Sequence, residues 1–424
     1  MHHVMTHTNP LLIIIVFLFL SLNQTDIIKA GNMDTIPGTI PGNWDPFNKA
    51  QITKLINTYG KTGNSWNELK PPYVVFDWDN TSIFLDIQEA TLIYQLENLV
   101  FGCTPDELDT MLQSGIAAGA LLDDTNLAGE RIAFENIAAD IRESYTWLYQ
   151  NYRQLGGGGS LPLDVVKKSL HYVNFIVKVR FLYDAVYNTF TAGVAYPWVT
   201  YLFAGLDSSL VRDMTYNTVI WQKSQPIEQV TWTSPGPVEL PGQHAGQVRV
   251  SWKNGLRLVP EMQELYTMFR EAGFDVWICS ASFVDVVKEI SSNPEFGYNN
   301  PASHVLAMEL ERDANGKILP VFRKGFDQTQ GPGKTKAIIR FLAGPSGRYG
   351  YDPIFVAGDS EGDQYMLSDF KGMIIGLIIN RFKGKGQILG DLTNQAVDSY
   401  KKDSARYLLQ GRDDKTGAFV PRQE

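Results

Sequence analysis

The sequence predicts an α/β protein with a Rossmann-like parallel sheet at its core and a large, mostly helical cap domain inserted into that core. Short apolar segments such as residues 73–77 and 354–357 alternate with segments of helical periodicity, which is typical of a parallel sheet. A long stretch, residues 87–250, separates the first of these strands from the others and is itself rich in helical periodicity. We therefore expect the first strand to join a sheet whose other strands come after the insertion.

The composition is that of an ordinary globular protein. The chain has 424 residues, of which 44% are hydrophobic and 20% are charged, and this length is enough for two or three domains. Its formal net charge is −9, and it has no dense block of lysine and arginine. A nucleic-acid partner is therefore disfavoured.

An unbroken apolar run at residues 11–20 indicates export. The run suits the core of a signal peptide better than a full bilayer span, and Ala30 followed by Gly31 gives a small-residue cleavage site. We expect a periplasmic or secreted protein with no stable membrane partner after cleavage. An uncleaved N-terminal anchor is the alternative, because no lysine or arginine precedes the run.

The two cysteines, Cys103 and Cys279, predict free thiols. One disulfide is possible in an exported protein, but Cys279 lies in a predicted core strand. Two buried thiols are the favoured interpretation.

The core elements follow from apolar pattern and stop signals. Residues 45–59 form an amphipathic helix beside the first strand, and a second helix runs from Pro260 to Ala272 before Gly273. The later core elements are a strand at 276–279, a helix from Phe283, a hairpin at 304–322 turning at Asn315-Gly316, a helix at 334–342, and strands at 354–357 and 373–379.

The insertion reads as a series of helices. Residues 86–99, 128–152 and 163–188 have helical periodicity, whereas residues 190–240 are aromatic and are expected to be irregular. The predicted division of the chain is a signal peptide at 1–30, an N-terminal lead and helix at 31–69, a core domain at 70–86 and 251–400, a cap domain at 87–250 and a tail at 401–424.

The first strand ends in two carboxylates, Asp77 and Asp79. Two acids at the mouth of a buried strand are costly, because like charges repel and burial disfavours both ionised forms. A cation or a reacting group usually offsets such a cost. Thr81 is expected to bond the backbone or the Asp79 carboxylate and so aim it.

Three further segments place polar groups beside predicted strands or helix starts. They contribute Ser280, Lys334, and the pair Asp359 and Asp363. The carboxyl ends of adjacent parallel strands would bring these groups and the first acids into one crevice. Oxygen-only ligands suit Mg²⁺, and a neighbouring lysine suits an anionic substrate, so the set favours phosphoryl transfer.

These four segments, in this order, resemble the four motifs of the haloacid dehalogenase (HAD) superfamily. Residues 77–81 match its Asp-x-Asp-x-Thr motif, Ser280 its second motif, Lys334 its third and residues 358–363 its fourth. The resemblance covers roughly residues 70–86 and 255–380. It implies a phosphatase with a HAD-type core, because an acid at the second position of the first motif can protonate an ester's leaving group.

The resemblance also implies a role for each residue. Asp77 would attack phosphorus and form an aspartyl-phosphate, and Asp79 would act as general acid and then as general base. Ser280 and Lys334 would hold the phosphoryl oxygens, with Lys336 as the alternative lysine. Mg²⁺ would be held by Asp77, the Asp79 backbone carbonyl, Asp359 and, in support, Asp363.

Residues 77–82, 86–90, 280–282 and 409–414 resemble exported phosphorylcholine phosphatases and phosphoserine-phosphatase-like hydrolases. The preferred substrate is a small phosphate ester, choline phosphate first; phosphoserine, a broad range of esters, or non-catalytic binding of a phosphate ester are the alternatives. A quaternary ammonium would need an aromatic cage. The insertion offers candidates for it: Trp147, Tyr149, Tyr152, Tyr196, Trp198, Tyr201, Trp221 and Trp232.

Overall fold

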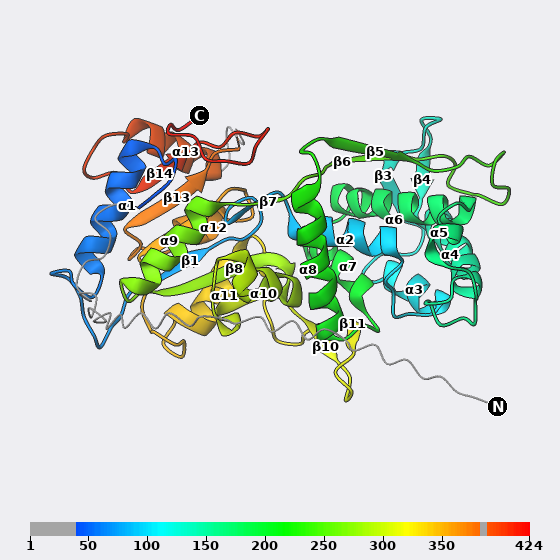
Figure 1. Cartoon of the computed structure of the whole chain (residues 1–424), viewed down its shortest axis with the longest axis horizontal. Coiled ribbons are helices and arrows are strands. Elements are labelled where there is room, and N and C mark those ends of the chain that lie inside the picture. The colour runs from blue at the N-terminus through cyan, green and yellow to red at the C-terminus, as the bar shows by residue number, and fades with distance from the viewer. Residues whose placement is uncertain (1–39, 382–387) are drawn as a thin grey trace, which may run out of the picture. The chain divides into compact units, whose positions relative to one another are not determined.

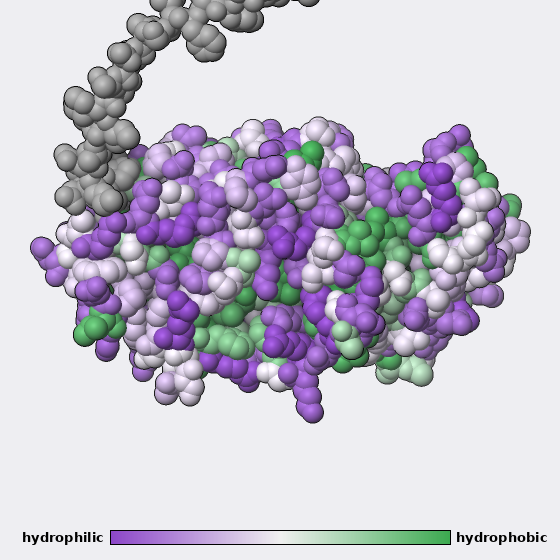
Figure 2. All heavy atoms as spheres, turned by 60° about the horizontal axis from the view of Figure 1, so that its bottom comes forward, coloured by the Kyte–Doolittle hydropathy of each residue, from purple (hydrophilic) through white to green (hydrophobic). Residues whose placement is uncertain are grey.

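A computed structural model describes residues 40–381 and 388–424 of the chain (Figure 1). The predicted signal peptide, residues 1–30, lies outside the described residues. Among the helices that are described, none has the length and apolarity needed to cross a membrane. On the face drawn in Figure 2, polar residues predominate and apolar residues form small separate patches, as is usual for a globular surface.

A six-stranded parallel sheet forms the centre of the protein, as the sequence predicts. The strands lie in the order β14-β13-β12-β1-β8-β9, and every neighbouring pair is parallel. Their bounds are β1 Tyr73–Phe76, β8 Asp275–Phe283, β9 Val305–Met308, β12 Phe355–Gly358, β13 Ile375–Ile379 and β14 Tyr407–Gln410.

Helices cover both faces of this sheet, because its strands are apolar on both sides. Val74 and Phe76 of β1 pack in one buried cluster with α1 (Pro46–Tyr59), α9 (Pro260–Glu271) and α10 (Val284–Ser292). Tyr73 and Val75 point the other way and pack in a second cluster. That cluster contains side chains of α11 (Pro332–Ile338), α12 (Gln364–Ser368) and α13 (Ile388–Asp398).

The long insertion after β1 folds around an apolar core of its own. Figure 1 shows its helices gathered to one side of the sheet, with two small antiparallel strand pairs. The helices are α2 Ile87–Asn98, α3 Pro105–Leu112, α4 Phe134–Asn151, α5 Leu163–Val166, α6 Leu170–Thr189, α7 Ala192–Thr200 and α8 Ser208–Ser224, and the strands are β3 Leu121–Thr125, β4 Arg131–Ala133, β5 Gln229–Thr233 and β6 Arg249–Lys253.

The expectation that residues 190–240 are irregular is wrong for most of that segment. Helices α7 and α8 occupy it as far as Ser224. Aromatic residues and Pro197 lower the local helix propensity, but Trp198 and Val199 of α7 are buried. Burial of these side chains outweighs their weak local preference for a helix. Helix propensity by itself does not include this burial.

Three core elements also differ from the prediction. Strand β8 continues to Phe283, four residues further than expected, so Ser280 lies inside a strand rather than after it. Residues 305–308 pair with β8 in the main sheet, and only β10 (Leu310–Arg312) and β11 (Ile318–Phe322) form the hairpin. The segment predicted as a tail contains β14, whose edge position depends on contacts distant in sequence.

The chain passes between sheet and insertion at two adjacent points. β2 (Ile83–Phe84) leads out of the core and pairs antiparallel with β7 (Arg257–Leu258), which leads back. The domain boundaries at residues 86 and 251 stay a prediction, but this short pairing lies close to both.

Candidate active site

The candidate site is built from the carboxyl ends of three adjacent strands. Asp77 follows β1, and Asp359 follows β12, which pairs with β1. Ser280 and Ser282 lie near the C-terminal end of β8, which is the other neighbour of β1. Parallel strands end at the same edge, so segments far apart in the sequence meet here.

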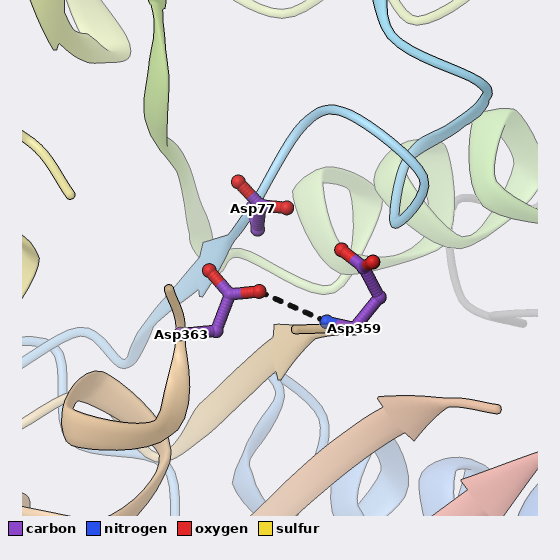
Figure 3. Close-up of side chains that lie close together, drawn as sticks. All are labelled: Asp77, Asp359 and Asp363. Atoms are coloured by element: carbon purple, nitrogen blue, oxygen red, sulfur yellow. Dashed lines mark hydrogen bonds between the residues drawn. The ribbon is translucent and has the colours of Figure 1, made fainter. Parts of the chain in front are cut away.

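Asp77, Asp359 and Asp363 form a buried acidic trio (Figure 3). One carboxylate oxygen from each lies within 4.8 Å of the other two. The Asp363 carboxylate accepts a hydrogen bond from the Asp359 backbone N–H at 3.0 Å, and Thr81 Oγ1 lies 3.1 Å from Asp77 and 3.0 Å from Asp359. The Thr81 hydroxyl therefore contacts two acids of the trio, Asp77 and Asp359. The expected hydrogen bond to Asp79 is not present.

The trio has the properties of a site for a hard divalent cation. Burial raises the pKa of Asp77 well above its ordinary value, and the charge of Asp363 adds to that rise. The pKa of Asp359 is raised by the same two causes. The ionised forms of Asp77 and Asp359 are therefore disfavoured unless positive charge is supplied, and three carboxylates without nitrogen or sulfur ligands fit Mg²⁺. No other such group of acids, histidines or cysteines occurs among residues 40–381 and 388–424.

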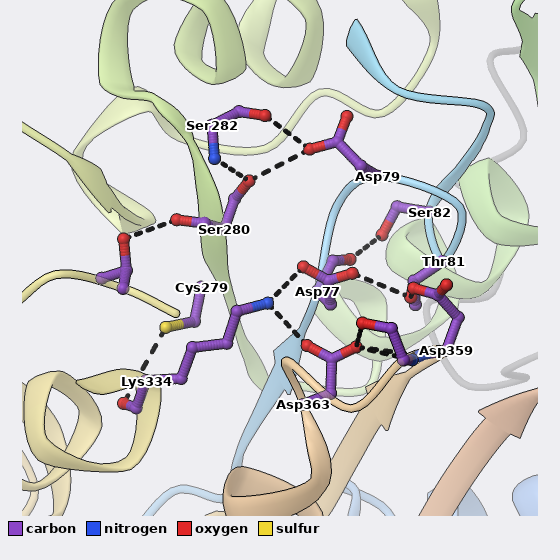
Figure 4. Close-up of polar contacts among 12 residues, drawn as sticks. Asp77, Asp79, Thr81, Ser82, Cys279, Ser280, Ser282, Lys334, Asp359 and Asp363 are labelled. Carbon is purple, nitrogen blue, oxygen red and sulfur yellow. Dashed lines mark hydrogen bonds and ion pairs between the residues drawn. The ribbon is translucent and has the colours of Figure 1, made fainter. Parts of the chain in front are cut away.

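Lys334 forms ion pairs with two acids of the trio (Figure 4). Its Nζ lies 2.5 Å from Asp77 Oδ1 and 2.6 Å from Asp363 Oδ1. Burial alone would lower the pKa of Lys334, but the carboxylates of Asp363 and Asp77 outweigh it and raise that pKa well above the ordinary value. Lys336, the alternative, is exposed to solvent, so the geometry selects Lys334.

Asp79 lies apart from the trio and is held as a proton carrier would be. Its Oδ1 accepts a hydrogen bond from the Ile87 backbone N–H at 2.7 Å, and its Oδ2 accepts one from Ser282 Oγ at 2.6 Å. Burial and the nearby charge of Asp86 raise the pKa of Asp79 to about 8. The carboxyl group can therefore carry a proton at neutral pH.

Ser282, which the sequence interpretation did not single out, is better placed than Ser280. Ser280 Oγ is 3.4 Å from Asp79 Oδ2, whereas Ser282 Oγ is at 2.6 Å. Ser282 lines the pocket described below and Ser280 does not. The two serines are two residues apart on β8 and therefore share one face of the strand, so both hydroxyls point toward Asp79 and Ser282 makes the shorter contact.

A pocket of about 680 Å³ opens over these groups. Asp77, Asp79, Lys334 and Asp359 line one end of it, which is the core side. Side chains of the insertion, together with further core residues such as Gln330 and Arg381, line the rest. They include the acids Asp86, Glu89 and Asp184 and the tyrosines Tyr183, Tyr187 and Tyr196, with Tyr365 of the core.

Only Tyr196 of the eight aromatic residues predicted for a cage lines this pocket. Trp198, for example, is fully packed in the apolar core of the insertion, and Trp232 packs edge-on against Trp252. Tyr183 and Tyr187 were not predicted. They lie one helical turn apart on α6, a spacing that an inspection for paired aromatics on one helix face could have found.

The acids on the insertion side surround a second buried cation, Arg180. Its guanidinium pairs with Glu89 of α2 and, at 2.7 Å, with Asp184 one turn along α6. It also lies over the rings of Tyr183 and Trp252, at 5.1 Å and 5.6 Å from their centroids. Burial raises the pKa of Glu89 to about 7, although Arg180 acts in the opposite direction.

Comparison with known proteins agrees with this geometry. No family model matches the chain. A phosphorylcholine phosphatase of Pseudomonas aeruginosa is 23% identical over 327 residues, which are 71% of this chain and 72% of that protein. A solved structure of a functionally unknown protein from Anaerococcus prevotii is 30% identical, with a TM-score of 0.81 over 90% of this chain and 97% of the other.

In sequence and fold, the chain resembles the phosphatases of the HAD superfamily. Its fold is the HAD fold, and the predicted resemblance to HAD phosphatases is confirmed. The relationship supports a phosphatase of the HAD type as the broad function, and the acidic trio is compatible with the divalent cation that such enzymes use.

Proposed function

We propose that this HAD protein is an exported, Mg²⁺-dependent phosphomonoesterase that acts through an aspartyl-phosphate, with choline phosphate as its preferred substrate. The observation that carries the proposal is the division of labour among the carboxyl groups. Asp77 is bonded to Lys334 beside the acidic trio, while Asp79 stands apart with a pKa raised to about 8 by burial and by Asp86.

Asp77 is the nucleophile in this proposal. One of its carboxylate oxygens forms a bond to phosphorus as the bond from phosphorus to the ester oxygen breaks. Lys334 stays protonated and offers its N–H groups to the phosphoryl oxygens. Mg²⁺, held by Asp77, Asp359 and Asp363, would neutralise phosphoryl charge and keep Asp77 ionised.

Asp79 moves the proton in both half-reactions. It gives its proton to the departing ester oxygen, which leaves as an alcohol. As a carboxylate it then takes a proton from the water that attacks phosphorus, and the bond between Asp77 and phosphorus breaks to release phosphate. Ser282 and the Ile87 N–H keep the Asp79 carboxyl group aimed during both steps.

The insertion side of the pocket favours a positively charged leaving group. Glu89, Asp184 and Asp86 place carboxyl groups there, and tyrosine rings offer π-faces to an organic cation, although Lys253 and Arg381 also line the pocket. Phosphoserine also carries an ammonium group, but its carboxylate would meet the same acids. Choline phosphate therefore fits better than phosphoserine.

The proposed setting is the periplasm or the outside of the cell, because of the apolar run at residues 11–20. A small phosphate ester is the proposed partner, and no nucleic acid is expected at a net charge of −9. After cleavage of the N-terminal segment, no stable membrane partner is expected.

A phosphate-release assay with purified protein tests the proposal. Choline phosphate, phosphoserine and a sugar phosphate are compared with and without added Mg²⁺. We expect the highest kcat/KM for choline phosphate and loss of activity with EDTA that Mg²⁺ restores. Binding of choline phosphate without release of phosphate would support the non-catalytic alternative, and equal kcat/KM for all three esters would remove the preference for choline.

A further inference from the structure

The C-terminal residues reach the centre of the site through one buried arginine. Residues 411–422 form a short turn-back, here the C-terminal hairpin, closed by hydrogen bonds between Gly411 and both Val420 and Arg422. Arg412 pairs with Phe419 across it, and Phe419 packs edge-on against Trp44 at 5.0 Å. The hairpin is thus anchored to the segment that leads into α1.

Arg412 contacts the loop that connects the catalytic acids to the insertion. Its Nη1 donates to the backbone oxygen of Asn80 at 2.7 Å, and its Nη2 lies 3.5 Å from Asn80 Oδ1. The guanidinium also lies over the ring of Phe84, 4.8 Å from its centroid. One side chain therefore holds both ends of residues 80–85.

That loop is short and has an unusual backbone conformation. Asn80 has φ of +57° and Leu85 has φ of +69°, and this left-handed conformation costs free energy above all for the leucine. The Asn80 N–H donates to the Leu85 oxygen at 3.1 Å, and the Leu85 N–H donates to Asn80 Oδ1 at 3.2 Å. A strained conformation of this kind persists only when the surroundings over-determine it, and Arg412 supplies a fixed external contact.

The loop carries groups on which the site depends. Asp79 directly precedes Asn80, and Thr81 directly follows it and reaches both Asp77 and Asp359. A displacement at Asn80 is therefore passed to the proton carrier on one side and to the acidic trio on the other.

Phe84, near the other end of the loop, is also contacted by Lys253 and Gly417. Lys253 of β6 lies over the same ring at 5.2 Å and donates to the backbone oxygen of Asp414 in the hairpin at 2.7 Å. Gly417, with φ of +76°, approaches so closely that a Cβ there would lie 2.7 Å from Phe84. The C-terminal hairpin and β6 therefore both contact the Phe84 ring of β2.

We propose that Arg412 is a positioning residue, which fixes the Asn80–Leu85 loop from the C-terminal hairpin and so sets the place of Asp79 and Thr81 for phosphoryl transfer. The kinetic part of the proposal rests on the proposed phosphatase function. The structural part, that Arg412 orders this loop in particular, does not.

The test uses the full-length protein with Arg412→Met and Arg412→Lys, and Lys415→Met as the control, because Lys415 is an exposed cation of the same hairpin. For Arg412→Met we expect kcat for choline phosphate to fall about 10- to 100-fold, since a shift of about 1 Å at reacting groups has effects of that size. KM should change less, and Arg412→Lys should recover part of kcat, because its ammonium can still reach the Asn80 oxygen and the Phe84 ring. Lys415→Met should match the wild type.

Hydrogen exchange measured on the same variants separates positioning from general stability. Arg412→Met should accelerate amide exchange in residues 80–86 with little change in the sheet strands. Wild-type kcat and wild-type exchange in residues 80–86 would overturn the proposal, as would faster exchange throughout the sheet with kcat per folded molecule unchanged. If Arg412→Met does not fold, Arg412→Lys decides by the same two measurements. A wild-type protein without phosphatase activity would refute the proposed function and leave the exchange test valid.

Discussion

The two sides of the pocket each combine acids with one buried cation, yet they arrange these charges differently. On the core side, Lys334 contacts Asp77 and Asp363, and three carboxylates converge within 4.8 Å. On the insertion side, Arg180 separates Glu89 from Asp184 and lies against aromatic rings. Converging oxygens suit a small metal ion, whereas acids spread around a guanidinium suit a larger organic cation.

The difference follows from what positions the acids. The core acids come from strand ends and tight turns, where backbone N–H groups hold Asp363 at 3.0 Å and 3.1 Å. The insertion acids are on helices α2 and α6, one or more turns from the strand edge. In the proposed mechanism, the rigid strand ends would therefore carry the chemistry and the helices would recognise the leaving group.

Asp77→Asn should break the core side most completely. Without a nucleophilic carboxylate we expect kcat to fall by about 10⁴-fold or more. The fold should remain, because the change removes one of three mutually repelling buried acids. Phosphate release measures the first effect and thermal melting the second; activity within tenfold of the wild type would rule out Asp77 as nucleophile.

Lys334→Met should come next in size, and Lys336→Met is its matched control. Loss of the ammonium leaves Asp77 and Asp363 without their shared cation, and we expect kcat/KM to fall about 10³-fold. Lys336 is exposed two residues away and should be neutral on substitution. Similar losses in both variants would show that helix α11, and not the Lys334 ammonium, is what matters.

The titration of Glu89 should make KM for choline phosphate depend on pH. Its pKa is raised by burial to about 7, so its negative charge is present above that pH and is lost as the pH falls through it. Because choline has a fixed charge, KM for choline phosphate should rise several-fold, about 1 kcal/mol, on going from pH 8 to pH 6. Glu89→Gln should have the higher KM at pH 8 and a KM close to that of the wild type at pH 6, and its own pH profile corrects for titration of the phosphate. A pH effect of equal size in Glu89→Gln would contradict this assignment.

The same shift has a consequence for stability. A carboxyl group whose pKa is higher in the folded protein than in the unfolded chain stabilises the fold below the unfolded value and loses that contribution as the pH rises through about 7. Thermal melting of wild type and Glu89→Gln across this range should therefore converge at low pH. The wild type should be the less stable of the two above pH 7.

Tyr196→Leu should have the smallest effect, and it tests the aromatic part of the insertion side. Loss of one ring beside a bound cation is worth about 1 kcal/mol, or roughly a fivefold rise in KM. Tyr149→Leu removes a tyrosine of the insertion that does not line the pocket. An equal rise in KM in both variants would assign the effect to general packing.

Several features of the site were readable from residue types alone. The Asp-x-Asp pair after an apolar strand, and the later Lys334, Asp359 and Asp363, were predicted with their order and strand context. Their convergence follows from a general rule, because parallel strands end at one edge of the sheet. The two free, buried thiols were also predicted, and both are confirmed.

Other features depend on contacts between distant residues, which no local pattern encodes. The closer contact of Ser282 than of Ser280 with Asp79 depends on the path of β8 beyond Cys279, where its register with β9 shifts. In the sequence, Arg180 is an ordinary residue of a predicted helix. Its ion pair with Glu89 forms only because α2 packs beside α6. Arg412 lies 332 residues from Asn80 and gains its role only when the C-terminal strand completes the sheet.

The sequence by itself determined the class of fold, the set of oxygen and ammonium groups, and the strand ends that carry them, because these depend on apolar periodicity and on residues adjacent in the chain. Only the tertiary structure decided which aromatic residues face the pocket and how the acids divide between the acidic trio and the insertion side. Those outcomes are set by helix packing and by burial, which shift the pKa of Asp79 and Glu89 in ways that residue identity does not fix.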